Sequence, residues 1–576
     1  MKRCPECGRN YNDDSMSFCL DDGAELLFGP ASMDEPATAI LHSTSAPGEA
    51  PTRAQIHLTD QTAVLPASTS DIAPQLRGFD KRLLAAPFLL AIIILGGFFG
   101  YRYITPAKQI ESIAMMPFEN RNSDADTEYL SDGLAESVMN RLSQLPDLKV
   151  SPTSSVFRYK GKDTDPQVIA TELGVDAVMT GRITQRGENL TINVNLVDAR
   201  VNKLLWGEQY ERKLSELLTT QREIVAEIVS KLQLKLSGES EQKLAKKYTD
   251  NNEAYQLYLQ GRYHWNKRQI PEFEKAIVFF KQAIEKDPNY ALAYSGLADT
   301  YTLFPDYGDF RPKEYLPQGK QAALKALELD PNLAEAHTSL AQIIMFSDYD
   351  FAGAEKSFKR AIELNPNYAT AHHWYSRLLS FSGRHDEAIR EITKAVELDP
   401  FSLAINGSMG LQLQLAGRFD EALLQNKKVN ELLPNEAAFH SFNYYVYAAQ
   451  GKYGQAAEED LLAAKATKDF KPENITKLKE AYEKGGWDGL GRMWQEITIK
   501  ELNAKQAKDP NGYVKAMDFA WAYALGKDKD KTIEYLNKAY DERDLNLTQL
   551  KVENTWDFVR DDPRFKELVK RVGIPE

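Results

Sequence analysis

Three cysteines, the residues best suited to metal or redox chemistry in this chain, all lie within its first twenty residues. Cys4 and Cys7 frame the tight turn C-P-E-C-G, and Cys19 opens the run C-L-D-D-G. Two thiolates in such a turn are typical zinc ligands. No cysteine follows residue 19, so no disulfide can form in the rest of the chain, and three clustered thiols favour a metal site over a redox pair.

The two halves of this segment resemble a zinc ribbon in which Asp22 stands in the place of the fourth cysteine. The resemblance implies a structural Zn²⁺ held by Cys4, Cys7, Cys19 and Asp22. Three thiolates with one carboxylate are less common in structural zinc sites than four thiolates. A degenerate remnant without metal is the alternative. A structural role is expected because 27 residues hardly build the open coordination position and the pocket that a catalytic site needs.

The remaining reactive residues form no catalytic pattern, and we predict that the chain is not an enzyme. Adjacent His372 and His373 would point about 100° apart on a helix, so one would face the core and the other a groove. Ser154-Ser155 lacks a nucleophile elbow, and no phosphate-binding or dinucleotide-binding glycine loop occurs. The net charge of −13, with an acidic excess in residues 1–27, makes nucleic-acid binding an unfavoured function.

Residues 83–104 are predicted to form one transmembrane helix. The run from Leu83 to Tyr101 carries no charge over 19 residues, just enough to cross a hydrocarbon core of about 30 Å. Residues 28–80 before it are rich in Ala, Ser, Thr and Pro and are expected to be a disordered linker. A small excess of Lys and Arg before the helix, and the reducing compartment that thiols prefer, place the N-terminus in the cytoplasm and the C-terminal domains in the periplasm.

A repeat of 34 residues dominates the second half of the chain. Its prolines lie at Pro288, Pro331, Pro366, Pro400 and Pro434, the last three 34 residues apart. A small residue lies twelve positions before each proline and again in a sixth copy: Ala276, Gly319, Ala354, Ala388, Ala422 and Ala456. Each unit is expected to be two antiparallel helices that cross closely at the small residue and end at the proline. In the second copy the extra residues around FPDYGDFRPKEY predict a protruding loop.

This pattern resembles the tetratricopeptide repeat (TPR). The resemblance implies a superhelical solenoid of about six repeats over residues 250–470, which binds a protein or peptide in its concave groove. After Phe470 the period loosens, and the helical pattern there predicts helical hairpins and a cap over residues 471–576. The helix columns that line the groove in this family give five candidate partner-binding residues: Asp299, Gln342, Arg377, Leu411 and Tyr445. Ordinary solvent-exposed side chains are the alternative for each of them.

Residues 109–236 alternate strand and helix patterns and predict a small α/β domain. Five motifs in this region resemble the TolB-like amino-terminal domain that precedes TPR arrays in many bacterial membrane regulators and cyclases: Pro117-Phe118-Glu119-Asn120, Asp132-Gly133-Leu134, Leu173-Gly174-Val175, Leu196-Val197-Asp198-Ala199 and Leu205-Trp206. The resemblance implies a fold and a periplasmic-type binding module, and no chemistry.

The predicted fold class is mostly α: a TPR superhelical solenoid, preceded by a small α/β domain, one transmembrane helix and a small zinc ribbon at residues 1–27. The predicted function is that of a scaffold for protein–protein interaction, anchored in a bacterial inner membrane and without catalysis. The alternative is a transmembrane signalling or transcription regulator, whose extracytoplasmic region senses a signal and whose cytoplasmic ribbon reports it.

Overall fold

The computed structural model describes residues 2–3, 10–11, 27–28, 109–122 and 127–575 of the 576-residue chain. The chain divides into two compact units, Met1–Phe99 and Gly100–Glu576. In the first unit, three short strands pair antiparallel in the order β2-β1-β3: β1 (Lys2–Arg3), β2 (Asn10–Tyr11) and β3 (Leu27–Phe28). The predicted zinc ligands Cys4, Cys7, Cys19 and Asp22 and nearly all of the predicted linker lie outside the described residues, so both remain predictions.

The localisation predicted from the sequence is not supported. Within residues 109–122 and 127–575, no helix combines the length and the apolar character needed to cross a bilayer. This finding contradicts the prediction of a single-pass inner-membrane protein with periplasmic C-terminal domains, and that localisation is not retained. Residues 83–104, which suggested it, lie outside the described residues.

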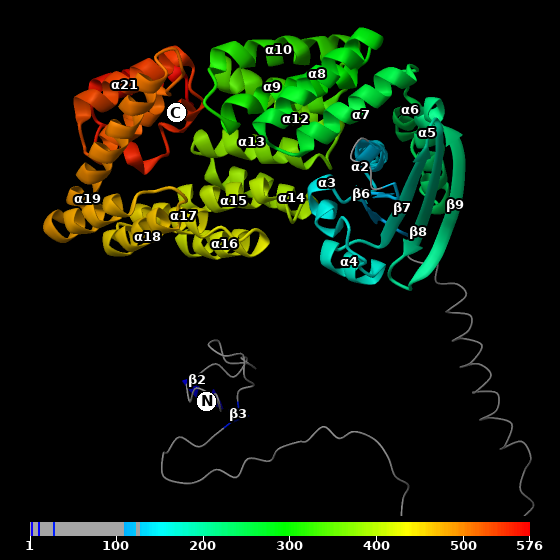
Figure 1. Cartoon of the computed structure of the whole chain (residues 1–576), viewed down its shortest axis with the longest axis horizontal. Helices are drawn as coiled ribbons and strands as arrows, with labels where there is room; N and C mark the ends of the chain where they lie inside the picture. The colour runs from blue at the N-terminus through cyan, green and yellow to red at the C-terminus, as the bar shows by residue number, and fades with distance from the viewer. Residues whose placement is uncertain (1, 4–9, 12–26, 29–108, 123–126, 576) are drawn as a thin grey trace, which may run out of the picture. The chain divides into compact units, whose positions relative to one another are not determined.

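A six-stranded sheet opens the second unit (Figure 1). Its order is β6-β4-β7-β8-β9, with β5 paired to β7; β4 runs parallel to β6 and β7, and β7, β8 and β9 form an antiparallel meander. The strands are β4 (Ser112–Met115), β5 (Glu119–Asn120), β6 (Lys149–Val150), β7 (Ala177–Arg186), β8 (Asn189–Asp198) and β9 (Lys203–Lys213). The main helices of this part are α2 (Glu128–Leu142), α3 (Thr153–Val156), α4 (Pro166–Leu173), α5 (Leu217–Lys231) and α6 (Gly238–Ala245). An α/β region is therefore present, as the sequence predicted.

Six helical hairpins follow between residues 252 and 466 of the described chain. Their helices are α7 (Asn252–Asn266), α8 (Ile270–Lys286), α9 (Ala291–Tyr307), α10 (Pro312–Leu329), α11 (Ala334–Ile343), α12 (Phe351–Leu364), α13 (Ala369–Phe381), α14 (His385–Leu398), α15 (Leu403–Leu415), α16 (Phe419–Leu432), α17 (Glu436–Ala449) and α18 (Tyr453–Ala466). A π-helical segment, η4 (Ile344–Asp348), extends α11. The recurrent alanines at the helix crossings are fully buried, which is the close approach that the period implied: Ala276, Ala354, Ala388, Ala422 and Ala456.

The prediction of a protruding loop in the second hairpin is wrong. The extra residues lengthen α9 to Tyr307 and start α10 at Pro312, so only a short turn separates the two helices. Three aromatic rings hold this turn against the helices: Phe304 stacks on Tyr315 at a centroid distance of 4.6 Å, and Phe310 meets both rings edge-on at 4.9 and 5.3 Å. Packing of these rings against one another stabilises the longer helices where a protruding loop was expected.

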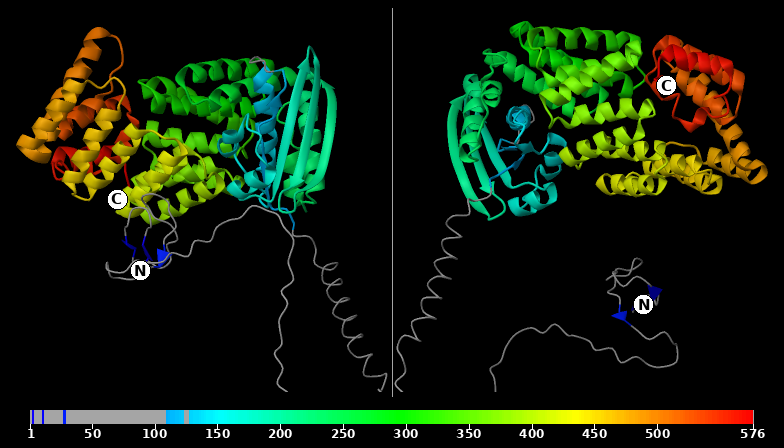
Figure 2. Two further views of the ribbon diagram at one scale, coloured as in Figure 1. Left: turned by 60° about the horizontal axis from the view of Figure 1, so that its bottom comes forward. Right: turned by 180° about the vertical axis from the view of Figure 1, so that it is seen from behind.

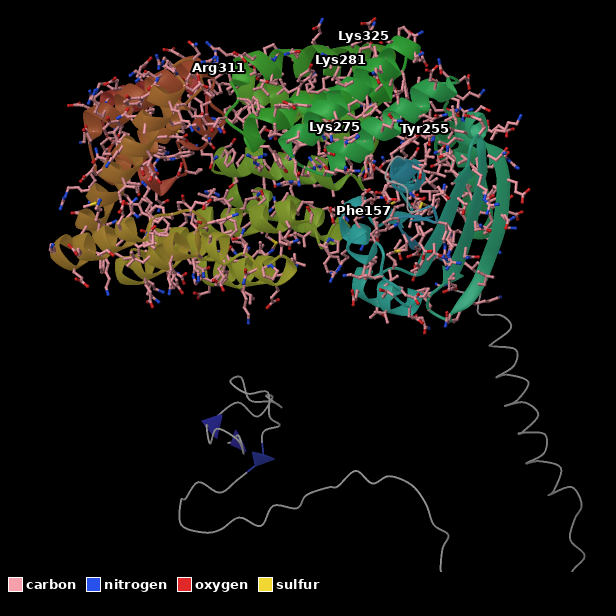
Figure 3. All side chains as sticks on the ribbon, in the orientation of Figure 1. Phe157, Tyr255, Lys275, Lys281, Arg311 and Lys325 are labelled. Carbon is pink, nitrogen blue, oxygen red and sulfur yellow. The ribbon has the colours of Figure 1, made fainter. Side chains whose placement is uncertain are left out.

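The C-terminal segment folds back onto the repeats. It consists of α19 (Pro472–Lys508), α20 (Ala516–Leu525), α21 (Lys529–Glu542), η5 (Leu545–Gln549), η6 (Asn554–Trp556) and α22 (Pro563–Val572). The ring of Tyr540 stacks on Tyr349 of the third hairpin at 5.7 Å, and the guanidinium of Arg311, at the second hairpin, lies 5.2 Å from the ring centre of Tyr513. Figure 2 shows these C-terminal helices at one end of the second unit and the sheet at the other, and Figure 3 labels Arg311.

Candidate partner-binding groove

The five residues predicted to line the groove lie one each on α9, α11, α13, α15 and α17, and their exposure rises along the array. Asp299 and Gln342 are buried, with 4% and 0% of their surface exposed. Arg377 is half-buried, whereas Leu411 and Tyr445 are 37% and 51% exposed. The concave wall is therefore open to a partner only in its C-terminal half.

In the N-terminal half, the predicted residues make internal contacts. The hydroxyl of Ser339 donates to the Asp299 carboxylate, Arg262 lies 3.6 Å from it, and burial raises the pKa of Asp299 to about 6. Gln342 is buried on α11 with neither amide atom hydrogen-bonded. Arg377 lies 3.9 Å from the carboxylate of Asp306 and within 6 Å of two phenylalanine rings.

The α/β region accounts for part of this burial, because α2 packs against α7. The hydroxyl of Tyr255 on α7 donates to Ser137 Oγ on α2 at 2.9 Å (Figure 3 labels Tyr255). Further along the same pair of helices, Arg262 donates twice to Glu136, at 2.6 and 2.9 Å. The α/β region therefore covers the face of α7 on which α2 packs.

The open half forms a groove of about 870 Å³ between the last repeats and the returning C-terminal segment. Most of its aromatic side chains come from three helices, α17, α18 and α19. The Trp487 ring on α19 stacks on Tyr453 of α18 at 5.0 Å and on Tyr444 of α17 at 5.9 Å, and Tyr445 meets Tyr444 edge-on at 5.0 Å. Trp494 lies two turns after Trp487 and also lines the groove.

Two carboxylates of the groove form no ion pair with any described residue, although Arg560 acts on Glu553 from a greater distance. Asp460 on α18 accepts a hydrogen bond from Trp494 Nε1 at 2.5 Å, and Glu553 accepts from Trp556 Nε1 at 3.0 Å. Across the part of the chain that the structure describes, no Lys, Arg or His nitrogen lies within 4 Å of either carboxylate. Burial raises the pKa of both groups, that of Asp460 to about 6. The nearby Asp488, in contrast, pairs with Lys527 at 2.5 Å.

Stacked aromatic faces beside unpaired carboxylates form a surface that attracts a cation. Cation–π attraction and the carboxylate charge act on the same group, and both strengthen where water is partly excluded. In the described residues, His, Cys, Asp and Glu side chains nowhere gather in threes at metal-binding distance. The chemistry that this groove supports is recognition of a Lys or Arg side chain flanked by apolar groups.

The adjacent histidines do not converge on a common ligand. His372 Nδ1 lies 2.6 Å from Glu391 and its Nε2 lies 3.0 Å from the carbonyl of Pro366. His373 is buried, and this burial, together with nearby Arg377 and Arg268, lowers its pKa to about 3. The His372 ring contacts groups of the fold itself, and the His373 ring is buried in it.

Asp460, Glu553 and Trp487 were not identified from the sequence. They lie outside the helix positions that line the groove in TPR proteins. Trp487 and Glu553 also belong to the segment after residue 470, where the 34-residue period is lost. A signal was present: Trp487 and Trp494, two of the seven tryptophans, are seven residues apart and so share one helix face.

Two family models match parts of the chain. Residues 108–228 match the HilA/YgeH-like transcriptional regulator, second domain, and residues 345–407 match the tetratricopeptide repeat. The chain therefore contains TPR repeats. The match in the α/β region is to the HilA/YgeH-like model, so the resemblance to a TolB-like domain remains a prediction.

Curated relatives share less than half of their length with this chain. Putative adenylate cyclase 3 of Rhizobium meliloti (strain 1021) is 31% identical over 237 residues, which are 41% of this chain and 40% of that protein. Transcriptional regulator HilA of Salmonella typhimurium is 22% identical over 251 residues, 41% of this chain and 43% of that protein.

Solved structures of TPR proteins resemble the repeat region. TTC0263, a thermophilic TPR protein of Thermus thermophilus, is 17% identical, with 34% of this chain and 98% of that chain covered and a TM-score of 0.29. YrrB, described as a TPR protein with an unusual peptide-binding site, is 22% identical, with 35% and 97% covered and a TM-score of 0.26. Both TM-scores are low.

Proposed function

We propose that this protein is a non-catalytic scaffold for protein–protein interaction, which binds a segment of a partner in the open half of its repeat array. TPR repeats support a protein-binding role, since stacked hairpins present a preformed concave surface. The observation that carries the proposal is the groove between α17, α18 and α19, where stacked aromatic rings lie beside the unpaired carboxylates of Asp460 and Glu553.

The chemistry of the groove selects the partner segment. A Lys or Arg side chain would supply the positive charge that the two carboxylates lack, and aromatic or aliphatic neighbours would cover Tyr445 and Leu411, which are exposed on the same concave wall. An acidic segment would place like charges together in a partly desolvated site and would be excluded.

Peptide binding to the full-length chain tests the proposal. Labelled twelve-residue peptides that carry Lys or Arg between aromatic residues should bind, and versions with Glu in place of the basic residues should not. Tyr445→Ala should weaken binding about tenfold, as loss of an aromatic anchor does. Leu424→Ala on the outer helix α16, where Leu424 is 70% exposed, is the matched control and should leave binding unchanged. Equal affinity for basic and acidic peptides, or equal effects of the two substitutions, would contradict the proposal.

A regulator of signalling or transcription is the second candidate function. The match of residues 108–228 to the HilA/YgeH-like second domain favours it. In that case the α/β region would transmit a signal to a transcriptional output. Deletion of residues 109–236 from the chromosomal copy should then change the transcript levels of a defined gene set; an unchanged transcriptome would leave the scaffold as the better account.

A further inference from the structure

A second cavity lies between the α/β region and the first repeats and shares no residue with the groove. Its volume is about 90 Å³, and α2 and α5 form one wall and α7, α9 and α11 the other. Five tyrosines line it: Tyr248, Tyr255, Tyr258, Tyr290 and Tyr368. Such a space fits a molecule of only a few heavy atoms.

One part of the cavity carries more negative than positive charge. Arg262 donates to Glu136 at 2.6 and 2.9 Å and lies 3.6 Å from Asp299. Arg268 also acts on Asp299, from beyond ion-pair distance. Glu335 on α11 lines the same cavity, and no Lys, Arg or His nitrogen of the described chain lies within 4 Å of its carboxylate. Burial, with Asp299 nearby, raises the pKa of Glu335 to about 7. Arg262 acts on it only from beyond ion-pair distance, so this carboxylate forms no ion pair in the described residues.

A buried hydroxyl in the same wall lacks a hydrogen-bond partner. Ser295 is only 2% exposed, its Oγ makes no hydrogen bond, and it lies one helical turn before Asp299 on α9. Gln144, just after α2, donates to the Tyr248 hydroxyl at 3.1 Å, but its Oε1 has no partner in the described residues. Buried polar atoms are rarely left unpaired in folded proteins, so these two acceptors point to a polar occupant.

The other two arginines of the cavity are engaged elsewhere. Arg141 donates to main-chain carbonyls at the C-terminal end of α6, including that of Leu244 at 3.3 Å, and lies 5.0 Å from the ring centre of Tyr248. Arg222 pairs with Asp250 at 3.3 Å and donates to the Thr249 carbonyl at 2.8 Å. Neither guanidinium reaches Glu335.

We propose that this cavity binds a small organic cation with one primary ammonium group, held between the Glu335 carboxylate and the tyrosine rings. The ammonium forms an ion pair with Glu335, lies against the faces of Tyr258 and Tyr368, and donates to Ser295 Oγ. Cation–π attraction gains strength because the site is largely shielded from water. This binding is independent of the peptide groove, since the two sites have no residue in common.

Isothermal titration of the full-length chain with propylammonium chloride tests the proposal, with 1-propanol as the neutral probe of equal size and sodium chloride as the salt control. Saturable binding of propylammonium alone is expected. Glu335→Gln should weaken it at least tenfold, while Tyr368→Phe, which keeps the ring, should leave it within about twofold and Tyr368→Leu should weaken it.

Glu553→Gln is the matched control, because it removes a carboxylate from the groove and not from this cavity. It should weaken basic-peptide binding and leave propylammonium binding unchanged, and Glu335→Gln should do the reverse. Circular dichroism and thermal unfolding of each variant separate a lost site from a lost fold; a variant that unfolds is replaced by Ser295→Ala, which should also weaken propylammonium binding. No saturable binding, equal binding of 1-propanol, or full binding by folded Glu335→Gln would show that the cavity holds water only and would overturn the proposal.

Discussion

Asp460 shows how a single residue in the groove can favour binding at a cost in stability. Its carboxylate is largely buried, the one hydrogen-bond donor that the described residues offer it is the neutral indole of Trp494, and burial raises its pKa to about 6. The ordinary pKa of an aspartate is near 3.8. The folded state therefore binds a proton more tightly than the unfolded state, so stability is lost as the pH rises from about 4 through 6.

Asp460→Asn should raise the free energy of unfolding by about 1 to 2 kcal/mol at pH 8 and change it little at pH 4, because the amide keeps the acceptor for Trp494 without the buried charge. The same variant should bind a basic peptide more weakly at pH 7.5. In the wild type, peptide affinity should fall as the pH drops from 7 to 5, as Asp460 takes up a proton. Urea unfolding at the two pH values and fluorescence anisotropy measure these effects. A variant that is less stable at pH 8 and binds as well as the wild type would refute this account.

The repeat pattern in the sequence could predict on which helix each of the five candidate residues lies. It could not predict how much of each side chain is exposed. Asp299 and Tyr445 occupy equivalent positions in their repeats, yet one is buried and the other is half exposed. The difference in exposure comes from the neighbours that cover each residue, and these neighbours belong to parts of the chain far away in sequence. A 34-residue period carries no information on such contacts.

At the scale of elements, the small residue of each second helix is the feature that the sequence predicted best. The spacing of the alanines follows from how closely two helices can cross, which is a local property. Ala422 lies at such a crossing and is fully buried. Ala422→Leu should lower the free energy of unfolding by about 1 to 3 kcal/mol through overpacking. Guanidinium unfolding measures the loss, and Leu424→Ala on the exposed face of the same helix should change stability by less than about 0.5 kcal/mol. Similar effects of both substitutions would mean that the crossing is not tightly packed.

Helix α19 depends on one glycine for its shape. Gly486 has φ 58° and ψ −147°, a conformation open essentially to glycine alone, and it lies directly before Trp487. The kink therefore sets where the Trp487 ring meets Tyr444 and Tyr453. No periodicity in the sequence marked this kink, because it lies where the repeat pattern has ended.

Gly486→Ala should cost about 1 to 3 kcal/mol of stability and weaken peptide binding, since Trp487 would be turned out of the aromatic stack. Gly454→Ala is the control, because Gly454 lies within α18, where a new methyl group meets only the Tyr482 hydroxyl at 3.8 Å. Tryptophan fluorescence and anisotropy report the stack and the binding. Unchanged binding by a folded Gly486→Ala protein would show that the kink does not position Trp487.

At the scale of the whole second unit, the α/β region and the segment that follows it contact the turns at which successive repeats end. Thr249 Oγ1, in the segment that joins the α/β region to the array, donates to Asp287 at 2.6 Å, and Lys246 lies 2.5 Å from Asp330. The side chain of Asn367 donates to the Leu145 carbonyl at 3.3 Å. The turn that ends each repeat was evident in the sequence, but its use as a docking point was not, because both partners must be folded before they meet.

The contact at Asp399, at the end of α14, is the best place to test whether these turns hold the α/β region. Ser155 Oγ donates to the Asp399 carboxylate at 2.7 Å and Ser154 Oγ donates to its other oxygen, while Asp399 is buried and its pKa is raised by that burial. Removing both hydroxyls leaves a buried carboxylate without these donors, which costs about 1 to 3 kcal/mol or more.

The double variant Ser154→Ala, Ser155→Ala should therefore release α3 and β6 from the fourth repeat, with faster amide hydrogen exchange in both elements and little change in α17 and α18. Adding Asp399→Ala should restore part of the lost stability, because the unpaired charge is gone, and the resulting coupling energy measures the contact itself. Ser143→Ala, a serine of the same region whose hydroxyl bonds only locally to the Asn140 carbonyl, is the control for the serine substitutions. If the losses in the double-mutant cycle are additive, the contact between the two serines and Asp399 does not hold the α/β region in place. The burial of the first repeats would then have to arise from the packing of α2 on α7 alone.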